Sequence, residues 1–192
     1  MATAGPNAPG TMADDAAVGT RTWATPDNAK VDDGTYTQWN NTSGGTWTSH
    51  YLKATNFGFA IPAGATINGV TAVIQRLITY TDGSTYVRDG TVKIVKGGTV
   101  SGDNKAATGT SWTTSPVDAS YGGAADLWGL TLTRDDVNSS TFGFVLSAIL
   151  SDAPDYEPTV RVDFMSMTIT YTEAGGGGGP VKQMMHIVRM RA

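Results

Sequence analysis

One long stretch of alternating side chains limits what this chain can fold into. Residues 67–81, INGVTAVIQRLITYT, are rich in β-branched residues and place apolar side chains at every second position. Successive side chains of a strand point to opposite faces of a sheet, so this spacing predicts a β-strand with one buried face. The side chains predicted to point inward are Val70, Ala72, Ile74 and Ile78, with Arg76 among them.

Two other stretches show the same period of two. Residues 91–96, TVKIVK, alternate valine and isoleucine with lysine and end at a pair of glycines. Residues 142–150, FGFVLSAIL, are apolar on one face through Phe142, Phe144, Leu146 and Ala148. Both are predicted to be strands of the same core.

The last apolar stretch, residues 160–172, changes its face partway along. Met165, Met167, Ile169 and Tyr171 share one side, whereas Val162 and Phe164 lie on the other. A strand that changes its apolar face contains a β-bulge or is buried on both sides, and the sequence leaves both alternatives open.

Composition supports an all-β fold. Charged residues make up only 16% of the 192 residues, whereas glycine occurs 24 times and threonine is abundant. Such a chain favours strands and turns over helices. We therefore predict a two-layer antiparallel β-sandwich of seven to nine strands, jelly-roll-like, with one short helical turn where Thr133 and Asp136 have the spacing of a capping box.

The chain divides into four segments by composition. Residues 1–20 are small and rich in turn formers, and we predict an extended N-terminal arm or a first edge strand. Residues 21–174 form the predicted sandwich domain, and residues 175–180, GGGGGP, form a flexible linker. Residues 181–192, VKQMMHIVRMRA, form an apolar and basic C-terminal tail.

Charge is distributed unevenly between the tail and the rest of the chain. The tail has three basic and no acidic side chains, which leaves 10 basic and 17 acidic side chains elsewhere, a charge of −7. An acidic body argues against nucleic acid as a partner. The charge of the tail alone fits an acidic protein patch, a phosphate surface or a membrane. No apolar stretch approaches the length of a membrane-spanning helix, and we predict no membrane partner.

An exposed segment as apolar as this tail needs a surface to bind, and methionine side chains adapt well to uneven grooves. We predict that the tail docks into a partner protein. We also predict that copies of this chain form a homo-oligomer on an assembled particle. The alternative is that the tail folds back as another strand of the same sandwich. The predicted docking residues are Val181, Lys182, Met184, Met185, Ile187, Val188, Arg189, Met190 and Arg191.

Few residues have the pattern of a catalytic site. The chain has two histidines, His50 and His186, and two glutamates, Glu157 and Glu173, so a hydrolytic triad or a carboxylate pair is difficult to assemble. Cysteine is absent, which excludes disulfides and thiolate metal sites. We predict a non-enzymatic protein without a cofactor or a metal. Calcium at the aspartate-containing turns 32–34 and 101–105 is the alternative.

Aromatic residues in turn-rich stretches suggest a second function. Tryptophan and tyrosine rings can stack on sugars, and a platform of such rings would recognise a host glycan. The alternative is that these large side chains close the ends of the sandwich, as we expect for Trp128. The residues of the possible glycan-binding site are Trp39, Trp47, Tyr51 and Trp112.

Several segments together resemble a β-sandwich module of tailed-phage structural proteins. The similarity covers roughly residues 20–172, and its markers are IPAGATINGV, VKGG, and DLWG followed by DVNSSTFG. The resemblance implies a virion protein, such as a capsid decoration protein, a head fibre or a tail-associated part. It implies no catalytic residue.

The first 20 residues lack the basic and apolar regions of a secretory signal. We therefore expect synthesis in the host cytoplasm and incorporation into a virion, with other capsid or tail proteins as partners.

Overall fold

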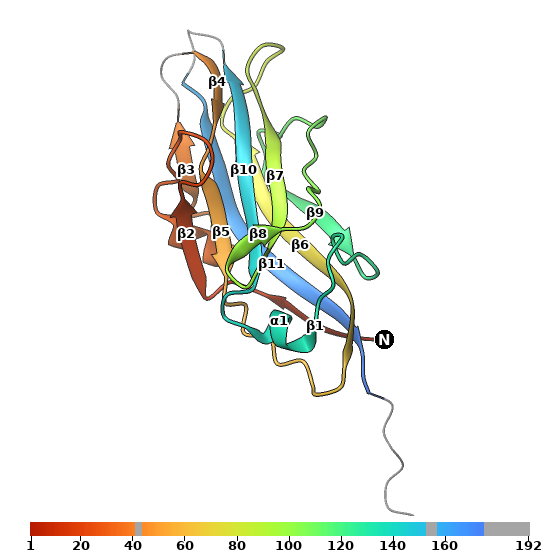
Figure 1. Ribbon diagram of the computed structural model, residues 1–192. Coiled ribbons are helices and arrows are strands. Elements are labelled where there is room, and N and C mark those ends of the chain that lie inside the picture. Colours follow the sequence, from red (N-terminus) through yellow and green to blue (C-terminus); the bar gives the residue numbers. More distant parts are fainter. Residues whose placement is uncertain (41–43, 153–156, 175–192) are drawn as a thin grey trace, which may run out of the picture.

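The computed structural model describes residues 1–40, 44–152 and 157–174 (Figure 1). In this part of the chain, eleven strands form two antiparallel sheets that pack against each other. The prediction of an all-β sandwich is confirmed, but the predicted seven to nine strands are too few. Short strands such as β4 (Gly45–Thr48) and β8 (Thr99–Ser101) have too few residues to show a period of two.

The first sheet is built on its two long strands, β11 (Thr159–Thr172) and β6 (Thr66–Ile78). Strand β9 (Val117–Gly123) pairs with the free edge of β6. The other edge of β11 is shared by β3 (Thr37–Asn40), which pairs with its beginning, and β1 (Ala2–Asn7), which pairs with its end.

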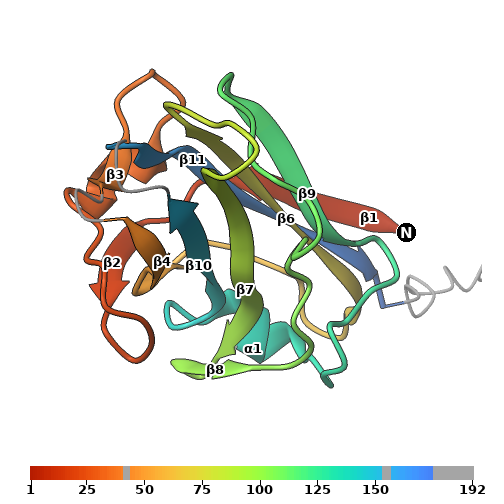
Figure 2. The same ribbon diagram turned by 90° about the horizontal axis from the view of Figure 1, so that it is seen from above.

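The second sheet has β10 (Gly143–Asp152) at its centre. Strand β7 (Tyr86–Lys96) lies on one side, and β5 (Tyr51–Thr55) and β4 share the other. Strand β8 extends the sheet beyond β7, and β2 (Thr11–Asp15) extends it beyond β5. Figure 2 shows the two layers from above, with β1, β6, β9 and β11 in one and β2, β4, β7, β8 and β10 in the other.

The strand order is that of a jelly roll. The principal strands lie in the order β1-β11-β6-β9 in one sheet and β5-β10-β7-β8 in the other. From β5 onward, every connection crosses between the sheets except the hairpin from β7 to β8. Neighbouring strands therefore come from distant parts of the sequence, which is the Greek-key arrangement that defines the jelly roll.

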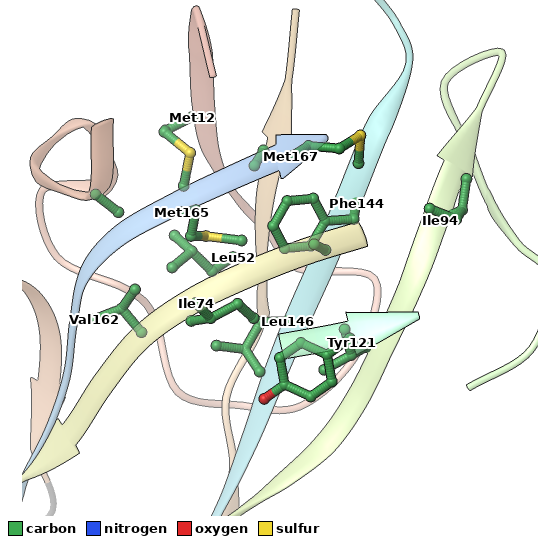
Figure 3. Close-up of a cluster of buried hydrophobic side chains, with 14 of the residues drawn as sticks. Met12, Leu52, Ile74, Ile94, Tyr121, Phe144, Leu146, Val162, Met165 and Met167 are labelled. Carbon is green, nitrogen blue, oxygen red and sulfur yellow. The ribbon is translucent and has the colours of Figure 1, made fainter. Parts of the chain in front are cut away.

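The core lies between the sheets and contains the side chains that the alternation predicted. Ile74 of β6 faces Phe144 and Leu146 of β10, and all three are fully buried (Figure 3). Strand β6 also buries Val70, Ala72 and Ile78. As the sequence pattern indicates, Arg76 lies on the same buried face of β6, and it is 7% exposed.

Strand β11 contains the bulge that its change of apolar face suggested. The pairing with β6 skips a residue between Val162 and Phe164, so Asp163 has no partner in the register. Because one extra residue reverses the alternation, Val162 and Met165 both point into the core although they are three residues apart. Phe164 remains on the outer face and is only half-buried.

The predicted helical turn is α1 (Arg134–Asn138). The Thr133 hydroxyl accepts a hydrogen bond from the Asp136 backbone N–H, and the Asp136 side chain accepts one from the Thr133 N–H, which completes a capping box. A short 3-10 helix, η1 (Pro26–Lys30), was not predicted.

Residues 1–20, for which we predicted an arm or a first edge strand, contain both β1 and β2, each at the edge of a sheet. Ala2 pairs with Tyr171, so the beginning of the chain and Ala174 lie at the same end of the sandwich (Figure 1). We call this the tail end, because residues 175–192 follow from it. The opposite, far end is where Asn40 pairs with Thr159.

Candidate functional site

A polar pocket lies at the far end of the sandwich. It has a volume of about 380 Å3 and opens between the segment 20–24, strand β3 and the beginning of β11. The residues that line it are Thr20, Arg21, Thr22, Ala24, Gln38, Trp39, Asn40 and Thr159.

The pocket exists because two neighbouring segments separate. Ala24 and Gln38 exchange backbone hydrogen bonds, with N–O distances of 2.9 and 3.4 Å. Further from this pair, the N–H groups of Thr20 and Arg21 instead donate to the Thr48 carbonyl in the second sheet, at 2.8 and 3.2 Å. The segment 20–24 is thus held by both sheets, and the gap beside β3 remains open.

Trp39 forms part of the pocket wall and is only 5% exposed. Its ring belongs to the core and meets the Trp23 ring edge to face, with centroids 6.3 Å apart. The indole Nε1 of Trp39 is buried and has no hydrogen-bond partner among the described residues. A buried donor without an acceptor is costly and rare in folded proteins.

The other four tryptophans differ from Trp39 in this respect. The indole N–H of Trp23 donates to the His50 carbonyl at 3.0 Å, and that of Trp47 donates to the Gly44 carbonyl at 2.8 Å. Trp112 donates to Asp89 at 2.8 Å and Trp128 to the Val70 carbonyl at 2.9 Å. Trp39, which lines the pocket, is the exception.

The rim of the pocket is held in place by stacking and hydrogen bonds. The Arg21 guanidinium lies 3.9 Å from the centre of the Trp47 ring. The Gln38 side-chain carbonyl accepts a hydrogen bond from Arg161 Nε at 3.0 Å, and Arg161 in turn lies over Tyr36. These contacts orient two of the lining residues from outside the pocket.

The described lining of the pocket is rich in hydrogen-bonding groups. The described lining residues are mainly threonines and amides, and no aspartate, glutamate or histidine is among those described. Hydroxyl and amide groups can donate and accept hydrogen bonds, but they are poor general acids and bases. The described lining therefore suits a polar ligand, with Arg21 as its one charged residue among those described.

The residues of the predicted glycan-binding site do not share one exposed surface. Trp39, Tyr51 and Trp112 are 5%, 9% and 2% exposed, so most of each ring is covered, and glycan binding by these residues stays a prediction. Trp47 is partly exposed, but Arg21 covers one face of its ring. Tyr51 packs against Val95 and Val145 on the outer side of the second sheet, in a separate small apolar cluster.

A buried network accounts for Trp112. Asp89 on β7 is fully buried and accepts hydrogen bonds from Trp112 Nε1 and the Tyr121 hydroxyl, each at 2.8 Å. It also accepts from the Ala107 N–H at 2.9 Å and forms an ion pair with Arg76 at 3.3 Å. Burial, together with the neighbouring Asp89 charge, raises the pKa of Tyr121 well above its usual range. The network joins β6, β7 and β9 to the loop that follows β8.

The groups considered for catalysis are held in structural pairs or exposed. His50 Nδ1 lies 2.7 Å from Asp14 Oδ2, and the other Asp14 oxygen accepts from the Trp23 N–H at 2.8 Å. Glu157 and Glu173 are exposed and far apart in the fold. Within residues 1–40, 44–152 and 157–174, no cluster of three or more histidine or acidic side chains could hold a metal ion.

The nine predicted docking residues, from Val181 to Arg191, lie outside the described residues. No helix in the described part of the chain has the length and apolar character needed to cross a membrane. No family model matches the chain, and no curated protein sequence matches it.

Sequence reasoning identified only Trp39 among the pocket residues. The threonines and amides of the lining had no recognisable motif, because they come from three separate segments. The one available signal was the threonine-rich run TRTWAT at residues 20–25.

Proposed function

We propose that this protein is a non-enzymatic structural protein of a virus particle. The jelly roll is the displayed domain, and the tail anchors it to other capsid or tail proteins. The assignment to a phage particle rests on the sequence resemblance, and the anchoring geometry rests on the fold.

The observation that supports anchoring is the polarity of the domain. Ala2 pairs with Tyr171, and residues 175–192 therefore follow from the tail end. Strand β11 runs from Thr159 at the far end to Thr172 at the tail end. At 3.3 Å per residue, 14 residues span roughly 45 Å. A domain attached by its tail would thus present its far end, with the polar pocket, outward.

The described surface of the sandwich also supports association through the tail. Its exposed large hydrophobic residues are Met1, Val31 and Val117, and these come from separate segments. Stable protein interfaces have an apolar centre, which the tail supplies and these scattered residues do not. Association is therefore expected to use the tail.

The decisive experiment compares the full chain with a chain that ends at Ala174. Strand β11 ends at Thr172, so the shorter chain retains every described strand. We expect it to be a folded monomer by light scattering and circular dichroism, whereas the full chain assembles. If both chains are monomers, the tail requires a different protein of the particle as its partner. If both assemble alike, the sandwich provides the interface and the proposal is wrong.

Two variants of the full chain separate the apolar from the electrostatic contribution. One replaces Val181, Met184, Ile187, Val188 and Met190 with serine and keeps the charge of the tail. The other replaces Lys182, Arg189 and Arg191 with glutamine and keeps the apolar side chains. We expect the serine variant to lose assembly and the glutamine variant to retain most of it at physiological salt, because screening weakens exposed charges.

A further inference from the structure

We infer that the outer edge of β9 binds the tail of a second copy of this chain, which adds to the first sheet as one more strand. The inference rests on the proposed function, because it names the partner of the tail. The occupant of the edge is residues 181–192 of the other copy. Addition of a strand to an exposed sheet edge is a recurring mode of peptide recognition.

Strand β9 is the last strand of the first sheet, and among the described strands it pairs only with β6 (Figure 1). Val70 of β6 donates its N–H to the Asp126 carbonyl on the same side. Backbone groups alternate in direction along an antiparallel strand, so every second residue of β6 from Val70 onward bonds β9. The register then leaves the N–H and carbonyl groups of Asp118, Ser120 and Gly122 pointing away from β6. These groups have no hydrogen-bond partner among the described residues.

The other described edge strands are protected in the ways that natural sheets use. Strand β8 has only three residues, and β1 contains Pro6 and an irregular register. Residues 20–24 form hydrogen bonds with β2, β3 and β4 through Asp14, Gln38 and Thr48. Strand β9 has seven residues and contains neither proline nor lysine. Its outer edge is therefore the longest regular edge that is open in the described part of the chain.

Acidic side chains lie beside this edge. The Gln75 side-chain amide donates to Asp118 at 3.2 Å and to Asp32 at 3.5 Å, which places both carboxylates on the outer face of the first sheet. Among the described residues, neither they nor Asp33 form an ion pair. The tail has three basic side chains and no acidic one. The tail and the β9 edge are thus complementary in charge.

The two faces of an extended tail match the two faces of β9. Val117 lies on the same face of β9 as the buried Tyr121 and is 48% exposed, whereas Asp118 lies on the outer face. In the tail, Val188 and the methionines at even positions share one face, and Arg189 lies on the other. A strand that places Arg189 on the acidic outer face therefore buries its apolar face beside Val117.

The length of the linker favours the edge of another copy over that of the same chain. Ala174 lies beside Gly64, six residues before Val70, which is the partner of Gly123 in β9. A strand beyond β9 is also three strand spacings from β11. These offsets combine to roughly 24 Å, whereas residues 175–180 as a flexible coil have a root-mean-square span of about 13 Å. Most conformations of the linker would therefore not reach the edge of their own chain.

Hydrogen exchange of the full chain tests the inference without a variant. It is followed by mass spectrometry with fragmentation to single amides, at concentrations below and above those at which light scattering detects assembly. Below, we expect the N–H groups of Asp118, Ser120 and Gly122 to exchange as unprotected amides. Above, their exchange should slow at least about tenfold, the equivalent of one hydrogen bond. The N–H groups of Ala119 and Tyr121 point to β6 and should be protected at both concentrations.

A pair of variants then tests the backbone contact itself. Ser120→Pro removes the central N–H of the outer edge, and an edge strand tolerates proline where its N–H faces solvent. We expect the domain to stay folded by circular dichroism and assembly to be lost. Ser120→Ala is the matched control, because it keeps the N–H and should assemble as the unaltered chain does. If Ser120→Pro unfolds the domain, exchange of the unaltered chain decides alone.

Three results would overturn the inference. If the full chain assembles while the three outward amides stay unprotected, the tail binds another surface. If these amides are already protected in the dilute monomer, the tail pairs with its own chain. If the full chain stays monomeric at every concentration, its partner is a different protein. None of these results disproves anchoring, which is wrong only if the chain that ends at Ala174 assembles like the full chain.

Discussion

Arg76 shows at the scale of one residue how sequence and structure complement each other. The alternation of β6 placed an arginine on an apolar face without indicating what would neutralise it. The fold brings Asp89 within 3.3 Å of it, and Trp112, Tyr121 and the Ala107 N–H donate hydrogen bonds to the same carboxylate. A buried charge is tolerated only when it is paired and hydrogen-bonded in this way.

Removing the carboxylate should therefore be costly. We expect Asp89→Ala to lower the free energy of unfolding by about 3–5 kcal/mol, because Arg76 would remain buried without a counter-charge. Urea denaturation measures the change. The control is Asp27→Ala, which removes an exposed ion pair with Lys30 and should cost less than about 1 kcal/mol. Similar losses in the two variants would show that the network contributes little.

At the scale of elements, the pairing of β10 with β5 requires the two backbones to approach closely at Gly143. Gly143 begins β10 and pairs with both β5 and β7. A Cβ atom at this position would overlap the Ala54 carbonyl oxygen of β5. The side chain of any other residue would therefore push the two strands apart.

We expect Gly143→Ala to lower the free energy of unfolding by about 3 kcal/mol, the upper part of the range for overpacking. Gly83→Ala is the matched control, because no atom lies within 4 Å of its added Cβ. The control should leave stability unchanged or slightly raised. Thermal denaturation monitored by circular dichroism gives both values. If the two variants have the same melting temperature, strands β5 and β10 can move apart at no cost in stability.

At the scale of the whole molecule, several carboxylates make stability depend on pH. Hydrogen bonds from the N–H groups of Thr85 and Ser84 and from the Ser84 hydroxyl lower the pKa of Asp82 to about 2. A hydrogen bond from Lys53 lowers the pKa of Asp15. Asp163 behaves in the opposite way, because burial, reinforced by the charges of Asp32 and Asp33, raises its pKa.

The sign of the pH dependence follows from these directions. A lowered carboxyl pKa adds stability above the unfolded value, 3.8 for Asp82, and this stability is lost as the pH falls through the folded value. The raised pKa of Asp163 adds stability at low pH that is lost as the pH rises through the interval between its unfolded and folded values. Carboxyl groups with a lowered pKa are more numerous among the described residues, because the pKa values of Asp126 and Asp136 are lowered as well.

We therefore expect the free energy of unfolding to fall as the pH is lowered from about 4 to 2. An NMR titration should place the Asp82 pKa near 2. Asp82→Asn should flatten the stability profile in the same range, because the substituted side chain does not titrate. An unchanged profile in this variant would show that the turn at residues 82–85 does not contribute to acid sensitivity.

The sequence alone determined the features that depend on near neighbours in the chain. The period of two identified the buried faces of β6 and β10. The change of face in residues 160–172 indicated either a bulge or burial on both sides, and the structure has a bulge at Asp163. The capping box of α1 was visible because Thr133 and Asp136 are three residues apart. Each of these patterns reflects local backbone geometry, which a short stretch of sequence already contains.

Only the tertiary structure decided which distant segments meet. The pocket needs residues 20–24, 38–40 and 159 at one end of the sandwich, and the partner of Arg76 lies on another strand. Burial of Trp39, Tyr51 and Trp112 also depends on the crossing of strands between sheets. A jelly roll places sequence-distant strands side by side, so its pocket and its buried polar contacts have no local signature in the sequence.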